Sequence, residues 1–269
     1  MKARVPSGNA LVTGASSGIG KELARLIAAD GYDLVLVARR QERLEELARE
    51  LSVAHGVSAR VIAADLADPA SPKRIVEELE TERIAVDVLV NNAGFGIYGR
   101  LWKSDITRQL EIIQVNVVAL TDLTGRLVPG MVSRARGRVV NVASTAAFQP
   151  GPYQAVYYAT KAYVLSFSEA IAEELKGTGV TVTALCPGPT TTEFQEAAGL
   201  EDTWLFRGPL VMDAAKVARA GWSGAKRGKR VVIPGVGNKL IKETVRFSPR
   251  RLVTAAAGRV QKKRSKEKK

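Results

Sequence analysis

Tyr157 and Lys161 are two residues whose types and spacing could support acid–base chemistry. They are four positions apart in a stretch with helical periodicity, so they share one face of a helix. Free tyrosine has a pKa of about 10, which is too high for efficient proton transfer at neutral pH. A nearby ammonium group favours the phenolate and lowers that pKa. The pair is therefore a candidate for acid–base chemistry, although the same spacing also occurs by chance in many helices.

Ser144 is a second candidate for the same site. It lies just after the apolar segment 138–142, thirteen residues before Tyr157. In open α/β sheets, ligands bind beyond the carboxyl ends of the strands, which is where this serine would lie. Its hydroxyl could polarise a carbonyl oxygen.

A glycine-rich turn at residues 14–20 has the features of a phosphate-binding loop. It follows an apolar strand, opens a helix and has the spacing G-x3-G-x-G. Glycines allow the backbone to approach a pyrophosphate, and the helix N-terminus offers unpaired N–H groups to it. The alternative is a plain tight turn. The residues expected to bind phosphate are Gly14, Ser16, Ser17, Gly18, Ile19 and Gly20.

The end of the second expected strand indicates which dinucleotide would bind. An acidic residue at this position would hydrogen-bond the ribose 2′-hydroxyl of NAD. The chain has Arg39 and Arg40 there, and a guanidinium can pair with a 2′-phosphate. NADP(H) is therefore the expected cofactor, with Arg39 as the favoured contact. The alternative is that both arginines only solvate the start of the next helix.

Strands and helices alternate along the chain in a way that would position these residues. Several strands are continuous apolar runs, which suits parallel strands covered on both faces. The alternation predicts an α/β fold with a doubly wound parallel sheet, the three-layer Rossmann architecture, with about seven strands. The expected strands are residues 9–13, 34–38, 60–64, 86–90, 138–142, 180–185 and 230–233. The expected helices are residues 19–29, 41–54, 72–83, 106–132, 156–176 and 214–225.

We expect one domain at residues 1–235 and a basic extension at 236–269. Residues 190–212 have no clear periodicity and are too long for a routine connection, so they are expected to form a lid. Apolar runs such as Leu34 to Ala38 are much too short to span a membrane. No signal peptide is expected.

Taken together, these motifs resemble the classical short-chain dehydrogenase/reductase family over residues 9–233. Thr13 to Gly20 is similar to its nucleotide loop. Asp65 and Leu66 match the pair that the family places against adenine. The other matching residues are Asn91, Asn92, Ala93 and Gly94 beneath the cofactor, Asn116, Ser144, Tyr157 and Lys161 as a catalytic tetrad, and Pro187, Gly188, Thr190 and Thr192 at the nicotinamide end.

The resemblance implies hydride transfer between NADP(H) and a carbonyl or secondary alcohol. It implies that Tyr157 exchanges the proton, that Ser144 holds the reacting oxygen, and that Lys161 binds the nicotinamide ribose. Asn116 would hold a water that links Lys161 to solvent. Tyr157 and Lys161 would thus both also contact the cofactor. A homodimer or homotetramer is a further family expectation, and no metal is needed.

Apolar residues after the fourth strand and in the lid favour an apolar substrate of acyl, lipid-like or steroid type. The alternative is that they pack the lid onto the body, since one sequence does not reveal which side chains line the cleft. These residues are Phe95, Ile97, Tyr98, Leu101, Trp102, Phe194, Leu200, Trp204, Leu205, Phe206, Leu210 and Met212.

The charge of the chain is concentrated at its end. The whole chain has a net charge of +13, yet residues 1–225 contain 24 Lys/Arg and 25 Asp/Glu. Residues 226–269 contain 16 Lys/Arg and 2 Asp/Glu. A basic amphipathic segment could lie on an anionic membrane surface, bind nucleic acid, or simply be solvated or packed in an oligomer. Nucleic acid is the least favoured partner.

The counts of cysteine and histidine exclude some kinds of functional site. The single cysteine, Cys186, excludes an internal disulfide and favours a reducing cytoplasm. It ends an apolar strand and is expected to be a buried thiol. The single histidine, His55, argues against zinc and Ser-His-Asp sites. The rival hypothesis is a non-catalytic NADP-binding scaffold or sensor that acts through its basic tail.

Overall fold

The computed structural model describes residues 7–200, 203 and 210–262. Its centre is a seven-stranded sheet in the order β3-β2-β1-β4-β5-β6-β9 with all pairs parallel. This confirms the doubly wound sheet. The strands are β1 (Asn9–Thr13), β2 (Asp33–Ala38), β3 (Ala59–Ala63), β4 (Val86–Asn91), β5 (Gly137–Val142), β6 (Val180–Leu185) and β9 (Val231–Val232).

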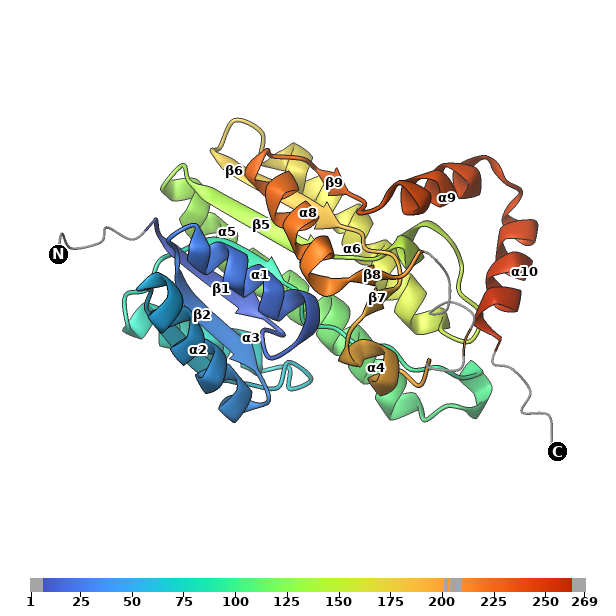
Figure 1. Cartoon of the computed structure of the whole chain (residues 1–269), viewed down its shortest axis with the longest axis horizontal. Coiled ribbons are helices and arrows are strands. Elements are labelled where there is room, and N and C mark those ends of the chain that lie inside the picture. The colour runs from blue at the N-terminus through green and yellow to red at the C-terminus, as the bar shows by residue number, and fades with distance from the viewer. Residues whose placement is uncertain (1–6, 201–202, 204–209, 263–269) are drawn as a thin grey trace.

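Helices cover both faces of this sheet (Figure 1). One face packs against α1, α2 and α8, and the other against α3, α5 and α6, which gives the three expected layers. The helices are α1 (Gly18–Ala29), α2 (Gln41–His55), α3 (Ser71–Thr81), α4 (Ile106–Ile113), α5 (Leu120–Ser133), α6 (Ala155–Glu174), α7 (Glu193–Ala197), α8 (Ala214–Lys226), α9 (Val236–Phe247) and α10 (Arg250–Gln261).

The strand sequence explains the two-faced core. In β1, Ala10 and Val12 pack into the same apolar cluster as Leu23 of α1. Leu11, between them, packs with Leu123 of α5 on the opposite face. Successive side chains of a strand point to opposite faces, so a strand buried on both faces must be apolar throughout.

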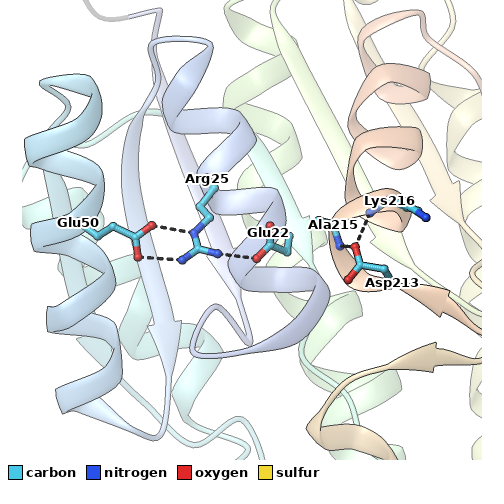
Figure 2. Close-up of polar contacts among 6 residues, drawn as sticks. All are labelled: Glu22, Arg25, Glu50, Asp213, Ala215 and Lys216. Atoms are coloured by element: carbon cyan, nitrogen blue, oxygen red, sulfur yellow. Dashed lines mark hydrogen bonds and ion pairs between the residues drawn. The ribbon is translucent and has the colours of Figure 1, made fainter.

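An ion pair joins the two helices that cover one side of the sheet (Figure 2). Arg25 of α1 donates to both carboxylate oxygens of Glu50 on α2, at 2.7 and 2.9 Å. Its remaining terminal nitrogen donates to Glu22 Oε1 at 2.6 Å. The hydrogen bond from Arg25 lowers the pKa of Glu50, and the guanidinium pKa is raised in turn. The pair links α1 to α2 at the surface of the protein.

Helix α8 begins at a carboxylate cap, also drawn in Figure 2. Asp213 Oδ1 accepts hydrogen bonds from the backbone N–H groups of Ala215 at 2.9 Å and Lys216 at 3.2 Å. Asp213 also closes β8 (Met212–Asp213), which pairs with β7 (Thr190–Thr191) at the edge of the expected lid. Of the expected lid residues, Trp204, Leu205 and Phe206 lie outside the described part of the chain.

The structure divides the long helix expected at residues 106–132. A π-helical segment, Gln114–Ala119, separates α4 from α5. Asn116 lies within it and is 1% exposed, with its side chain directed at the backbone of Phe95. Single π-helical turns are rare and are frequent at functional sites, and periodicity alone does not distinguish them from α-helix.

The basic segment after residue 235 forms two helices. α9 starts at Val236, and α10 follows after a short turn. In Figure 1 both lie beyond the carboxyl ends of the strands, at the far side of the molecule from the N-terminus. Among the described residues, no helix combines the length and apolarity needed to cross a bilayer.

Candidate active site

A cavity of about 890 Å³ lies at the carboxyl ends of the central strands. The sheet order places β1 beside β4, so the loops after these strands diverge and leave a crevice between them. The predicted residues that line the cavity are Gly14, Ser16, Ser17, Gly18, Ile19, Arg39, Asp65, Leu66, Ala93, Gly94, Ser144, Tyr157, Lys161, Pro187, Gly188, Thr190 and Thr192. Gly20, Asn91 and Asn116 are not among the lining residues.

The glycine loop needs its glycines because of close backbone contacts. Gly14 has φ +64°, and a Cβ there would lie 2.9 Å from Ala93 Cα. A Cβ on Gly20 would lie 2.4 Å from Gly14 O. Gly20 therefore permits close packing of α1 against the loop, while Gly14 and Gly18 provide the left-handed turns that precede the helix.

Arg40 reaches the glycine loop directly. Its guanidinium donates hydrogen bonds to Ser16 Oγ and Ser17 Oγ, each at 3.1 Å. It also pairs with Glu193 of α7 at 2.7 Å, and Arg43 pairs with the same carboxylate. Both arginines lower the pKa of Glu193, against the opposing effect of its burial. The sequence favoured Arg39, which lines the same cavity; the structure brings Arg40 to the loop as well.

Asn91 and Asn92 have different surroundings. Asn91 is buried, and its amide donates to Thr124 Oγ1 at 3.0 Å and Asn141 Oδ1 at 2.9 Å. Asn92 lines the cavity and donates to the carbonyls of Thr13 at 2.9 Å and Gly14 at 3.1 Å. Asn92 thus holds the glycine loop, whereas Asn91, which was expected beneath the cofactor with it, does not line the cavity.

Tyr157, Lys161 and Ser144 meet in the cavity as their spacing predicts. Lys161 Nζ lies 5.7 Å from the centre of the Tyr157 ring and donates to the carbonyl of Val142 at 2.8 Å. Ser144 follows β5 and accepts a hydrogen bond from the backbone of Ala146 at 3.1 Å. The three side chains come from the end of β5 and one face of α6.

The pKa values of this group depend mainly on burial. Removal from water raises the pKa of Tyr157 to about 12, although a hydrogen bond with Ser144 lowers it. Burial lowers the pKa of Lys161 to about 8. The expected net lowering at Tyr157 is therefore absent in this structure, because desolvation outweighs the stabilisation of its phenolate. A protonated phenol at neutral pH is suited to donate a proton.

Asn116 links the surroundings of Tyr157 and Lys161 through hydrogen bonds. Its Oδ1 accepts from the backbone N–H of Phe95 at 3.1 Å, and its Nδ2 donates to Phe95 O and Thr160 Oγ1, each at 3.0 Å. Thr160 in turn donates to the carbonyl of Tyr157 at 2.7 Å. The amide thus ties the loop after β4 to α6. Its expected contact with a water molecule stays a prediction.

Cys186 is a buried thiol, as expected. Its side chain is 0% exposed, and burial raises its pKa to about 12. A protonated thiol without access to solvent is a poor nucleophile. Within the described residues, no cluster of three or more His, Cys, Asp or Glu is placed to hold a metal ion.

The expected substrate residues divide into two groups. Phe95, Phe194, Leu200 and Leu210 line the cavity, and the ring of Phe194 is centred 5.3 Å from that of Tyr157. Other expected residues, Ile97, Tyr98, Leu101, Trp102 and Met212, do not line it. Trp102 is 76% exposed, because the short helix that carries it, Leu101–Lys103, turns toward solvent.

Helices α9 and α10 form a further wall of the cavity. Their lining residues are Asn238, Ile241, Lys242, Thr244, Val245, Leu252, Val253, Ala256, Ala257, Val260 and Gln261. Asn238 packs so closely on the segment after β6 that a Cβ on Gly188 would lie 2.4 Å from its Oδ1. The sequence contained the apolar–basic alternation of this segment, but gave no indication that its apolar side faces the site.

The comparisons with known proteins agree with this architecture. The family model described as short chain dehydrogenase matches residues 8–202, and the chain belongs to this family. A short-chain dehydrogenase from Sphingobium yanoikuyae, solved in complex with NADPH, is 33% identical with a TM-score of 0.81, covering 89% of this chain and 92% of that one.

Two curated relatives are longer than this chain. A short chain dehydrogenase of Pseudocercospora fijiensis is 39% identical over 68% of this chain and 60% of its own length. A very-long-chain 3-oxoacyl-CoA reductase of Phaeosphaeria nodorum is 34% identical over 80% of this chain and 64% of its own length. The chain thus spans less than two thirds of either relative.

Proposed function

We propose that the protein is an NADP(H)-dependent oxidoreductase that interconverts a carbonyl compound and a secondary alcohol. The observation that carries the proposal is the meeting of Tyr157, Lys161 and Ser144 in one large cavity beside a glycine loop. Membership of the short-chain dehydrogenase family and the NADPH complex of the Sphingobium neighbour support it.

The cavity has the features that NADP(H) requires. The loop from Gly14 to Gly18 offers backbone N–H groups and two serine hydroxyls to a pyrophosphate. Arg40 and Arg39 would offer guanidinium groups to the 2′-phosphate, and Asp65, which follows the third strand, would contact the adenine. Lys161 and the segment Pro187 to Thr192 would hold the nicotinamide end.

When bound, NADPH supplies the hydride, and the chain's own residues handle the proton and the orientation. Tyr157 donates its phenolic proton to the carbonyl oxygen. Ser144 hydrogen-bonds the same oxygen and holds it against Tyr157. Lys161 is positively charged below its pKa of about 8, and this charge stabilises the phenolate once the proton has left. Oxidation of an alcohol uses the same groups in reverse.

Tyr157→Phe tests this assignment, with Tyr163→Phe as the matched control. Tyr163 lies on the same helix, is 39% exposed and does not line the cavity. We expect Tyr157→Phe to lower kcat by roughly 10²–10⁴-fold and to leave NADPH affinity unchanged. Full activity of Tyr157→Phe would contradict the mechanism. A wild-type protein that binds NADPH but shows no turnover would favour the scaffold hypothesis.

We further propose that the substrate is largely apolar. Phe95, Phe194, Leu200 and the apolar side of α9 and α10 support this, because they surround the space next to Tyr157. Screening ketones of increasing chain length by loss of NADPH absorbance tests it. Activity should rise with chain length; a preference for short charged aldehydes would contradict it.

The assembly we propose is a homodimer or homotetramer through α4, α5 and α6. Exposed apolar side chains lie on these helices and on the π-helical segment between α4 and α5, namely Ile106, Leu110, Ile113, Val118, Val132 and Tyr163. Leu110→Glu should weaken the assembly in a light-scattering measurement of molar mass. An unchanged molar mass would place the interface elsewhere.

The exposed side of α9 and α10 has a different character, and we propose that it contacts anionic membranes. Leu240 and Phe247 are 63% and 82% exposed. Residues 236–262 contain seven Lys/Arg and one Asp/Glu. A symmetric contact between two copies of this face would place cations against cations, so an anionic lipid surface complements it better.

A further inference from the structure

Two buried glutamine amides in the cavity have unused hydrogen-bonding capacity. Gln154 is 3% exposed and Gln261 is 1% exposed, and both line the cavity. Gln154 Nε2, Gln261 Nε2 and Gln261 Oε1 are buried and have no hydrogen-bond partner among the residues that the structure describes. These are two N–H donors and one carbonyl acceptor directed to no protein group.

The packing of α10 places this helix against the loop that precedes Gln154. A Cβ on Gly258 would lie 3.3 Å from Pro152 Cγ, so α10 rests against the loop that leads into Gln154. Gln261 is three residues after Gly258 and therefore lies on the same helix face. Gln154 is three residues before Tyr157, directly ahead of the first turn of α6. Both amides thus belong to the lining of the cavity that also contains Tyr157.

Burial makes this arrangement costly without a ligand. A buried polar group that lacks its hydrogen bond loses its hydration without compensation. Most buried side-chain amides in proteins are paired, so an unpaired one calls for an explanation. Two such amides in one cavity are accounted for if a ligand supplies the missing partners.

The surroundings define the chemistry of that partner. The cavity residues contributed by α10 are uncharged, and the nearby Lys242 is paired with Glu243 at 2.5 Å. The amides themselves are uncharged, so a neutral polar group matches them. It must accept from an N–H group and donate to a carbonyl at once. An amide does both, because its oxygen accepts and its N–H donates.

We propose that Gln154 and Gln261 bind an amide group of the substrate, so that the enzyme prefers apolar carbonyl compounds with an amide close to the reacting carbonyl. The preference for such substrates rests on the function proposed above. The binding of the amide does not, because it can be measured without turnover.

The first experiment compares two probes that differ by one N–H group. N-Ethyl-3-oxodecanamide carries the amide, and ethyl 3-oxodecanoate has an ester oxygen in place of its N–H. With NADPH and the wild-type enzyme, we expect kcat/KM to be at least about tenfold higher for the amide than for the ester. A site that hydrogen-bonds a substrate N–H discriminates against analogues that lack this donor. Equal kcat/KM for the two probes would overturn the inference, while reduction of both would leave the proposed function intact.

Variants then assign the effect to the two side chains. Gln261→Leu removes the acceptor for the probe's N–H and should raise KM for the amide probe more than for the ester. Gln154→Leu removes a donor to the carbonyl oxygen that both probes carry and should raise KM for both. Gln114→Leu is the matched control, because Gln114 Nε2 is also buried and unpaired but does not line the cavity. If a leucine variant fails to fold, methionine at the same position removes the amide with less change of shape. An equal KM change for both probes in Gln261→Leu would mean that Gln261 has only a structural role.

A binding measurement separates failure of this inference from failure of the proposed reaction. Calorimetric titration of Tyr157→Phe, loaded with NADP⁺, uses the unreactive probes N-ethyldecanamide and ethyl decanoate. The inference is supported, even if no turnover is ever found, if the amide binds more tightly than the ester. This difference should be lost in the double variant that carries both Tyr157→Phe and Gln261→Leu. Equal binding of the two compounds overturns it.

Discussion

At the scale of single residues, we propose that Arg40 contacts the 2′-phosphate of NADP(H), together with or in place of Arg39, since both line the cavity. Arg40 already donates to Ser16 and Ser17 of the glycine loop. Arg40→Ala should weaken NADPH binding about 10- to 100-fold, since a hydrogen bond to a charged group contributes ~1.5–3 kcal/mol. NADH binding should change little. Fluorescence titration with both nucleotides measures this, with Arg39→Ala in parallel; equal weakening of both nucleotides would contradict the assignment.

Lys161 gives a prediction for the pH dependence of stability. Its pKa falls from 10.5 to about 8 on folding because it is buried. Between these two values the unfolded chain binds the proton and the folded protein does not, so stability rises with pH in this window. The rise is at most about 3 kcal/mol.

Urea unfolding at pH 7.5 and pH 10 tests this prediction by comparing the wild type with Lys161→Met. The stability of the wild type relative to this variant should increase toward pH 10. The comparison cancels Cys186, whose raised pKa acts in the opposite direction in both proteins. A difference that stays constant between the two pH values would contradict the assignment.

Much of the site could be predicted from residue types and spacing, since sequence-local features position it. The glycine loop, and the i, i+4 pair of Tyr157 and Lys161, depend on one turn and one helix. The distinction between Asn91 and Asn92 could not be predicted, because it depends on which way the chain leaves β4. The pKa of Tyr157 could not be predicted either, since burial is a property of the whole cavity.

At the scale of elements, the N-terminal cap of α8 stabilises a helix that covers one face of the sheet. Asp213→Ala removes two hydrogen bonds to the first turn and should cost about 1 kcal/mol of unfolding free energy. Asp213→Asn keeps an oxygen acceptor and should cost much less. Urea midpoints measure both; a similar loss in the two variants would show that charge rather than capping matters.

The sequence predicted the order of strands and helices well, because apolar runs and helical periods are strong local signals. It missed the π-helical segment around Asn116, which shares the hydrophobic period of its neighbours. It also missed that α9 and α10 line the cavity. Their basic composition suggested a separate extension, whereas contacts such as Asn238 on Gly188 are set by tertiary packing.

At the scale of the whole molecule, the exposed side of α9 and α10 predicts binding to anionic vesicles. The protein should sediment with vesicles containing phosphatidylglycerol and not with pure phosphatidylcholine, and high salt should release it. Each cation near the surface contributes about 1 kcal/mol, so Lys239→Glu with Arg246→Glu should abolish binding.

Lys73→Glu with Arg74→Glu is the control for vesicle binding, because it makes the same charge change on α3, which lies apart from α9 and α10 in Figure 1. Equal binding to both kinds of vesicle, or equal loss in the control, would contradict a specific membrane face. Loss of binding only in Phe247→Ser would indicate that apolar insertion dominates.

The measurement that tests the central claim most directly is a fluorescence titration of the purified protein with NADPH and with NADH. The cavity, its glycine loop and Arg40 predict tight binding of NADPH and much weaker binding of NADH, with the same affinities in Tyr157→Phe. Binding of neither nucleotide would contradict the assignment of the cavity as a dinucleotide site.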